Sequence, residues 1–305
     1  MTSSPQQPEG LVLCGLDGSN PLAFLAALGT LRTLSLANQC LNECVRMSWR
    51  SGISWTPILH TTSRLTQEDL LETIDCVLAR SFDAHPLNAL ENRDDLRNTL
   101  VKWAGKSKAT DRQVVDFLSA LCSDLAPDAT SQLQTVRCDY FMGNLRGILA
   151  KTQKTHLHRA LFVPWDYADA LDNLSLHIEP TEDRRYAYQW HRPAGDPTRN
   201  RRGGMIGANR LTVEAFPFFQ SFATGDKLST RGFTGLRMDN TRWTWPIWSC
   251  ALEYHEIASL LGLPELQADN LDVQRLRARG IVTAFRCRRI LVEKTPNFTS
   301  ATAMF

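Results

Sequence analysis

The segment "LVLCGLDGSNPLAFLAALGTLRTLSLANQ", Leu11 to Gln39, decides the fold. Its apolar start is typical of a strand, and a polar turn over residues 17–20 follows it. Asn20 is a favoured helix cap and Pro21 a favoured first helical residue, so we expect a helix to begin at Pro21. From Leu22 to Leu36 this helix has almost no polar face, which predicts that it is buried on most sides. We expect Gly29 to let another element approach it closely.

The periodicity of the chain changes near residue 164. Before it, residues 45–60 predict a strand pair, and helical periods follow over 65–80, 94–105, 110–125 and 139–162. After it, we expect hairpins over 174–190 and 232–249, helices over 208–219, 252–263 and 272–280, and a last strand pair over 281–295. The sequence therefore predicts an α+β fold. A flexible lead (1–10) comes first, and a mainly helical portion with an N-terminal strand and a buried helix (11–163) follows it. The rest (164–305) is a mixed, basic portion with aromatic, Arg-rich β-hairpins. The last two portions can form one domain.

Composition and charge place the chain among globular proteins. Of its 305 residues, 43% are apolar and 22% are charged. The net charge of +2 hides an asymmetry, since residues 1–180 carry 16 basic and 20 acidic side chains and residues 181–305 carry 18 and 12. We therefore expect any polyanion to meet the second part of the chain.

The start of the sequence and its most apolar run indicate where the protein is located. The start "MTSSPQQPEG" lacks the basic region of a secretory signal, and the most apolar run contains Arg32 and is shorter than the ~20 residues of a membrane span. We expect a cytoplasmic protein with no membrane partner. The eight cysteines include no C-x-x-C pair, which argues against a zinc site and a disulfide framework.

Motifs that would indicate catalysis are sparse. The turn "GLDGSNP" lacks the lysine of a P-loop, and no serine lies in a G-x-S-x-G elbow. His156 and His158 are two residues apart in a helical pattern, so they point to different faces. Asp166, Asp169 and Glu182 remain as carboxylates that could bind a metal. We expect no catalytic residues, no metal and no cofactor, with a metal-dependent nuclease using these carboxylates as a minor alternative.

Arginines cluster in the second part of the chain, most densely in "RRYAYQWHRPAGDPTRNRRGGMIGANR", Arg184 to Arg210. The planar guanidinium binds phosphates in a bidentate manner, and aromatic side chains beside it are typical of surfaces that hold an unpaired strand. Two further clusters have the same character. Arg231, Arg237 and Arg242 lie around the tryptophans of "TRWTWPIW", which we expect in the core, and Arg286, Arg288 and Arg289 lie in the predicted last strand pair. The candidate nucleic-acid-binding residues are Arg184, Arg185, Arg192, Arg199, Arg201, Arg202, Asn209, Arg210, Arg231, Arg242, Arg288 and Arg289.

Several of these stretches resemble a known family. "GLDGSNPLAFLAALGTLRTL", "FVPWDYADALDNLSLHIEPTEDRRYAYQW", "GANRLTVEAFPFF" and "TRWTWPIW" are similar to successive motifs of a CRISPR-associated family of type I-G (formerly I-U) systems, described as an extension of their helicase-nuclease. The opening helix also resembles the start of the large subunit of type I-G Cascade. The resemblance covers residues 15–298, with D-R-R-Y-A and G-A-N-R-L as its more specific motifs.

The resemblance implies a non-catalytic subunit of a type I CRISPR effector that binds target DNA or crRNA in antiviral defence. Its partners would be other Cascade subunits and the helicase-nuclease. Helicase motifs and an HD nuclease signature are absent from this sequence, so the catalysis of that partner is not carried over. The alternative is an interaction adaptor whose arginines bind acidic surfaces of the helicase-nuclease.

Overall fold

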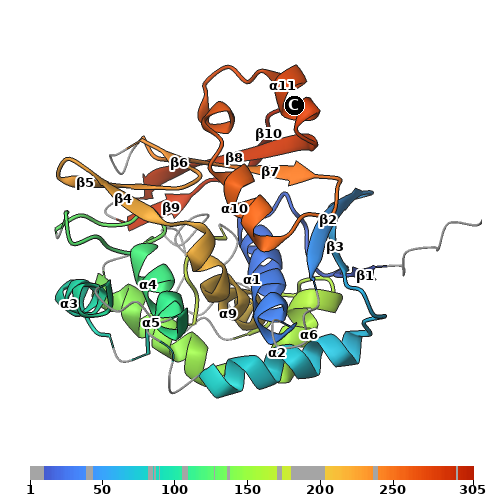
Figure 1. Cartoon of the computed structure of the whole chain (residues 1–305), viewed down its shortest axis with the longest axis horizontal. Helices are drawn as coiled ribbons and strands as arrows, with labels where there is room; N and C mark the ends of the chain where they lie inside the picture. Colours follow the sequence, from blue (N-terminus) through green and yellow to red (C-terminus); the bar gives the residue numbers. More distant parts are fainter. Residues whose placement is uncertain are drawn as a thin grey trace, which may run out of the picture.

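The computed structural model describes residues 10–38, 44–81, 85, 87–88, 90–104, 109–126, 128–135, 138–169, 174–179, 203–235, 240–292 and 295–305. Helix α1 (Pro21–Asn38) lies at its centre (Figure 1). The other helices are α2 (Gln67–Ser81), α3 (Arg93–Ala104), α4 (Ala109–Ser119), α5 (Cys138–Lys151), α6 (Lys154–Phe162), α9 (Ile206–Ala215), α10 (Tyr254–Leu261) and α11 (Val273–Ala278), with short 3₁₀ turns η3 (Phe216–Phe218) and η4 (Pro264–Gln267). Helices and sheets are both prominent, which confirms the predicted α+β class.

The start of α1 is as the sequence predicts. Asn20 caps the helix, since its Oδ1 accepts hydrogen bonds from the backbone N–H of Leu22 at 2.9 Å and of Ala23 at 3.1 Å. Pro21 is the first helical residue, where its missing N–H costs nothing. The side chain of Asp17 stabilises the preceding turn by accepting from the N–H of Ser19 at 2.9 Å.

Helix α1 packs most closely against α9, a helix almost 180 residues further along the chain. A Cβ added to Gly29 would lie 1.7 Å from the carbonyl oxygen of Leu211, so the two backbones touch at this point. This confirms the close approach expected at Gly29. Every residue of α9 is buried, because α1, α6 and η3 enclose it.

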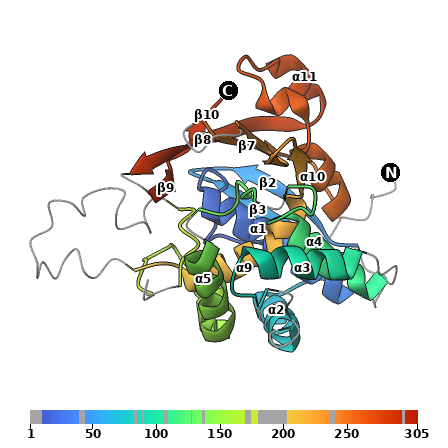
Figure 2. The same cartoon turned by 90° about the vertical axis from the view of Figure 1, so that its left-hand side faces the viewer.

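The described residues form three antiparallel sheets beside this helix pair. The first has the order β1 (Leu11–Val12), β3 (Trp55–His60), β2 (Arg46–Ser51). The largest has the order β10 (Thr302–Ala303), β8 (Ile281–Val292), β7 (Arg242–Trp248), β6 (Phe233–Thr234), with β9 (Thr295–Phe298) also paired to β8. The third is the hairpin of β4 (Ser221–Thr224) and β5 (Lys227–Thr230). In both views the largest sheet lies between α11 and α1, with α2 beyond α9 (Figure 1, Figure 2).

An aromatic cluster joins α1 to two of the sheets. The ring of Phe24 lies 5.7 Å from the rings of both Trp49 and Trp245, and Trp243 lies 4.5 Å from Trp245. The indole N–H groups of Trp245 and Trp248 donate to the carbonyl oxygens of Gly18 and Met47, each at 2.8 Å. The tryptophans of "TRWTWPIW" are therefore core residues, as predicted, and each ring pair adds about 0.5–1.5 kcal/mol beyond its buried area.

The helical run predicted over residues 139–162 is two helices. Gln153 adopts an extended conformation between α5 and α6. Its backbone N–H donates to Nδ1 of His156 at 3.0 Å, as part of a capping box. The prediction of one run is wrong because an imidazole at the third position of the second helix completes a cap that the periodicity alone does not show.

Two strand predictions also differ from the structure. Residues 174–179, expected as the first strand of a hairpin, form no strand, and the N–H of Leu176 donates instead to the side chain of Asn209 at 2.8 Å. Residues 281–295, expected to hold both strands of a pair, are mostly the long strand β8, and its partner β9 begins only at Thr295. β8 also pairs with β7 and β10. The hairpin expected over 232–249 is confirmed, with Phe233 opposite Trp243.

One apolar core includes residues from both predicted portions, such as Leu25, Phe141, Phe218 and Trp243. Among the described residues, no helix has the combined length and apolarity that crossing a bilayer requires. The predicted strand and basic loop from Arg184 to Arg202 lie outside the described residues, as does the lead over residues 1–9.

Candidate nucleic-acid interface

The outer side of the β7–β8 pair carries three arginines, Arg242, Arg286 and Arg288. Side chains alternate between the two sides of a strand, and Trp243 and Trp245 are buried on the inner side. Each of the three arginines is next to an inward-facing residue of its strand, so its side chain points away from the core. We call these three residues the arginine face.

The strand register places these charges close together. Arg242 lies directly opposite Arg288, and Thr244 lies opposite Arg286. Opposed residues in an antiparallel pair have Cβ atoms about 4.5–5.5 Å apart, and like charges in that arrangement destabilise the sheet. The strand pairing therefore keeps the three guanidinium groups of the arginine face close together although they repel one another.

Each arginine of the face is held differently. The Nε of Arg286 donates to the hydroxyl of Thr244 at 2.8 Å, and its Nη2 donates to the carbonyl oxygens of Leu266 and Ala268 at 3.1 and 2.9 Å. Arg242 forms an ion pair with Asp269. Arg288 is exposed, and its side chain has no ion pair or hydrogen bond within the described part of the chain.

The electrostatics of the face favour an anionic partner. Burial, followed by the charge of Arg242, lowers the pKa of the Arg286 guanidinium. Asp269 is the one carboxylate that pairs with the face among the described residues, so three positive charges meet one negative charge. An added polyanion would relieve the repulsion that the register imposes.

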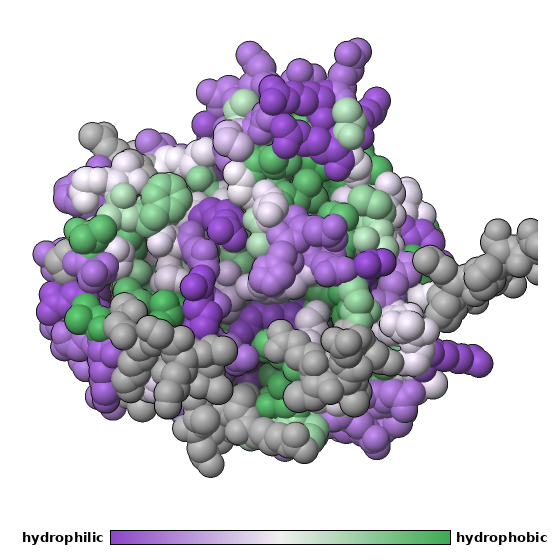
Figure 3. All heavy atoms as spheres, in the orientation of Figure 1, coloured by the Kyte–Doolittle hydropathy of each residue, from purple (hydrophilic) through white to green (hydrophobic). Residues whose placement is uncertain are grey.

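A hydrophilic lobe, residues 264–279, stands on the same side of the sheet and accepts the hydrogen bonds of Arg286 (Figure 3). Its helix α11 adds Arg275 and Arg277, and the residue after the helix is Arg279; none of the three was among the predicted site residues. Glu265 pairs with Arg275 at 3.0 Å and with Arg279 at 2.9 Å, whereas Arg277 is exposed. The signal that could have found them is the spacing "RLRAR", which again uses arginine and no lysine.

Two predicted site residues are interior. Asn209 is fully buried, and its Nδ2 donates to the carbonyl oxygen of Met205 at 3.0 Å while its Oδ1 accepts from Leu176. Arg210 is 2% exposed and its Nη1 donates to Glu214 at 2.7 Å. Both lie on the helix that packs under α1, so the structure corrects their assignment from a surface contact to an interior position.

Arg289 and Arg231 are also not part of the arginine face. Arg289 points into the core, one position after Arg288, where it donates to the carbonyl oxygen of Gln132 and lies 5.1 Å from the ring of Phe298. Burial lowers the pKa of Arg289 to about 10. Arg231 is half-buried and donates to the carbonyl oxygen of Phe218 at 3.1 Å. Strand alternation explains why only one residue of the pair Arg288 and Arg289 reaches the surface.

The other predicted arginines, Arg184, Arg185, Arg192, Arg199, Arg201 and Arg202, lie outside the described residues, and their assignment stays a prediction. Arg242 and Arg288 are therefore the predicted site residues that the structure brings together. Arg286, noted only as part of a cluster, joins them.

The carboxylates considered as metal ligands have other partners. Asp166 and Asp169 both form ion pairs with Arg159. Asp169 also accepts a hydrogen bond from the first N–H of α9, that of Ile206, at 2.9 Å. Glu182 lies outside the described residues, and within them no group of three or more metal-ligating side chains forms. The arrangement of Asp166 and Asp169 is accounted for by ion pairing and helix capping.

No family model, curated protein or solved structure matches this chain. What the protein binds is therefore inferred from its own residues.

Proposed function

We propose that this protein is a non-catalytic subunit of a type I CRISPR effector that holds target DNA or crRNA by its phosphate backbone, through the arginine face. The observation that carries the proposal is the direct opposition of Arg242 and Arg288, with Arg286 beside them and a single carboxylate partner. The type of complex rests on the resemblance of the sequence to the type I-G family. The proposal places the protein in the cytoplasm.

The chemistry of the face favours contact with the backbone over reading of bases. Guanidinium groups bind phosphate oxygens through paired, charge-assisted hydrogen bonds. The aromatic side chains of this sheet, Trp243 and Trp245 among them, point into the core, so they are not platforms for bases. Contacts of this kind position a nucleic acid without specifying its sequence.

Binding to fluorescent DNA and RNA oligonucleotides tests the proposal. Arg242→Ala together with Arg288→Ala removes one half-buried and one exposed charge. We expect the affinity for every sequence tried to fall by about tenfold or more, because a charge-assisted hydrogen bond contributes about 1.5–3 kcal/mol. Arg112→Ala on α4 is the matched control, since this exposed arginine lies on the other side of the sheet. Equal affinities of all three proteins would contradict the proposal.

A protein partner is the second candidate, and one contact favours it. Arg242 already binds a carboxylate, that of Asp269, as it would on an acidic protein surface. Pull-down of the helicase-nuclease and Cascade subunits from nuclease-treated lysate separates the two functions, because only a protein contact survives removal of nucleic acid. In that case the Arg242→Ala, Arg288→Ala variant should lose the partner while the free protein shows no affinity for oligonucleotides.

A further inference from the structure

A cluster of four ionisable side chains is buried between α1 and α9. Glu214 accepts a hydrogen bond from Nη1 of Arg32 at 2.9 Å through Oε2, and from Nη1 of Arg210 at 2.7 Å through Oε1. Nε2 of His85 lies 3.5 Å from Oε1 of Glu214. None of the four residues is more than 5% exposed. The nucleic-acid proposal does not use this cluster.

The charges of this cluster do not cancel. Burial lowers the pKa of His85, and its Nδ1 accepts a hydrogen bond from the N–H of Leu87, so the ring is neutral near pH 7. Arg32 and Arg210 are both cations, and Glu214, whose pKa the two arginines and His85 hold low against the opposing effect of burial, is the one anion. One positive charge is left over in a region from which water is excluded.

The surplus charge falls at Arg210. Its Nη2 is buried, and no described residue accepts a hydrogen bond from it. An unsatisfied charged donor in the interior is costly, since it has lost its water without gaining a partner. Interiors that keep such a group either tolerate the cost or supply an anion to it.

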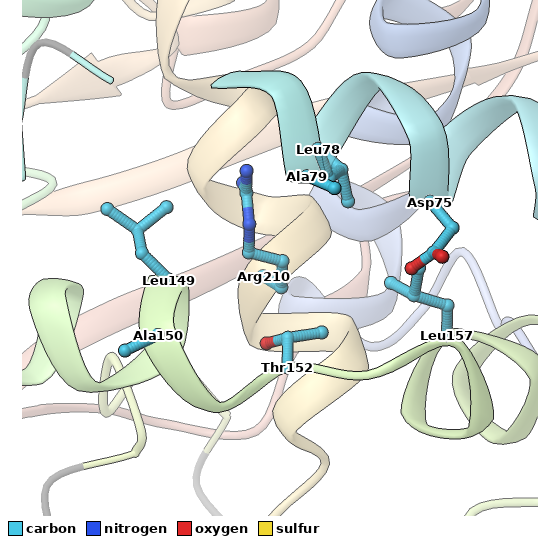
Figure 4. Close-up of a pocket in the computed structure, with 8 residues that line it drawn as sticks. All are labelled: Asp75, Leu78, Ala79, Leu149, Ala150, Thr152, Leu157 and Arg210. Carbon is cyan, nitrogen blue, oxygen red and sulfur yellow. The ribbon is translucent and has the colours of Figure 1, made fainter. Parts of the chain in front are cut away.

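A pocket of about 250 Å³ adjoins this side chain (Figure 4). It is lined by Leu78, Ala79 and Asp75 of α2, Leu149 and Ala150 of α5, Thr152, Leu157 of α6, and Arg210 of α9. Figure 4 shows the guanidinium of Arg210 extending between α5 and the end of α2, with Asp75 at the other end of the pocket. The lining between these two charged groups is mostly apolar.

We propose that this pocket binds a small molecule with one oxyanion group, a carboxylate or a phosphate, on a short apolar body. The oxyanion accepts from Nη2 of Arg210 and the body lies against the leucines. A volume of about 250 Å³ holds about eight water-sized atoms at ~30 Å³ each, which limits the ligand to roughly that number of non-hydrogen atoms.

The orientation of the ligand follows from the two charged ends. Asp75 repels an anion, so the charged group lies at the Arg210 end. Lys154 does not cancel the Asp75 charge, because it already pairs with Glu68 at 2.5 Å and with Glu72 at 3.8 Å. Nη2 is buried in the structure, so binding requires the side chains over it to move to another rotamer.

Titration of the full-length protein with three probes tests the proposal. Hexanoate carries a carboxylate on a short chain of eight non-hydrogen atoms in all, 1-hexanol is its neutral counterpart, and inorganic phosphate is the oxyanion alone. We expect hexanoate or phosphate to bind about tenfold or more tightly than hexanol, and the stronger of the two identifies which oxyanion the site prefers. Binding of neither anion, or equal binding of hexanol, would overturn the proposal.

Two variants locate the site. Arg210→Met should abolish the preference for hexanoate over hexanol. Ala150→Leu, which adds side-chain volume at the exposed edge of the pocket without changing Arg210, should weaken anion binding at least tenfold. Ala278→Leu on the exposed side of α11 is the control for the added side-chain volume. Anion binding that survives both Arg210→Met and Ala150→Leu would place the site elsewhere. The arginine face lies across the sheet, so its failure or success as a nucleic-acid site does not affect this result.

Discussion

Replacement of Glu214 by glutamine tests whether the buried cluster has a surplus of positive charge. The substitution keeps the shape of the side chain and removes the carboxylate that, among the described residues, pairs with both Arg32 and Arg210. Removal of one partner from a buried ion pair costs about 3–5 kcal/mol, because the remaining charge is left uncompensated. Here two guanidinium groups lose their partner at once, so we expect Glu214→Gln to lower the free energy of unfolding by at least that amount.

A much smaller effect on the free energy of unfolding is expected for Arg210→Met. Methionine fills similar space without a charge, and the remaining Arg32 and Glu214 form a balanced pair at 2.9 Å. Because Arg32 still compensates the charge of Glu214, the loss of Arg210 leaves no buried charge without a partner, and this variant should lie within about 1.5 kcal/mol of the wild-type protein. A single arginine substituted by methionine at exposed Arg112 sets the baseline.

Equilibrium unfolding in urea measures all three proteins. Arg210→Met should lie within about 1.5 kcal/mol of the wild-type protein and Arg112→Met near it, whereas Glu214→Gln should lie far below both. If Arg210→Met were as damaging as Glu214→Gln, the four side chains would act as a balanced network and the surplus charge would not exist.

Three other perturbations test separate parts of the structure. Gly29→Ala should lower the free energy of unfolding in urea by about 3 kcal/mol, because its Cβ would meet the backbone oxygen of Leu211 at 1.7 Å. Gly143→Ala on α5, where a Cβ meets nothing within 4 Å, should instead raise it by about 0.5–1 kcal/mol. Equal effects of the two substitutions would refute the close approach at Gly29. The pKa of His85 is lowered in the folded protein, so the unfolded chain takes up this proton first as the pH falls below about 6.5. The free energy of unfolding should decline from there by up to about 1.4 kcal/mol per pH unit. His85→Gln should flatten this decline, and an unchanged pH profile would exclude His85 as its source. Ala150→Leu should change the unfolding free energy by no more than about 0.5 kcal/mol, because Ala150 is exposed at the edge of the pocket. A large loss of stability would show that the added side chain clashes with the pocket wall.

Local rules in the sequence were sufficient to predict the centre of the fold. The cap at Asn20, the proline at the first helical position and the lack of a polar face each concern neighbouring residues, and together they give α1 its start and its burial. The hairpin of β6 and β7 is equally local, because alternation and a polar turn define it. Gly29 could be singled out because a glycine in a buried helix usually marks a close contact.

The candidate site was only partly predictable, because it depends on which side of an element faces the core. Arg288 and Arg289 are neighbours with the same chemistry, and only the pairing of β8 with β7 places one outside and the other inside. Asn209 and Arg210 belong to a helix that looks amphipathic in sequence but is enclosed by α1 and α6, elements far from it along the chain. Long-range packing of this kind leaves no signal in a local pattern.

The buried ion cluster shows the same limit. Arg32 and Glu214 are separated by 182 positions, and nothing local in either stretch indicates that they meet. A single arginine in an otherwise apolar helix was the available signal, since a buried arginine requires a partner.

The salt dependence of nucleic-acid binding tests the central claim most directly, that the arginine face contacts phosphates. Each phosphate contact contributes about 0.9 to the slope of log K against log salt concentration for duplex DNA and about 0.7 for a single strand. The slope for the wild-type protein should therefore be steeper than that for the Arg242→Ala, Arg288→Ala variant by about 1.4–1.8, while Arg112→Ala keeps the wild-type slope. Identical slopes for wild type and the double variant would mean that the arginine face does not touch the phosphate backbone.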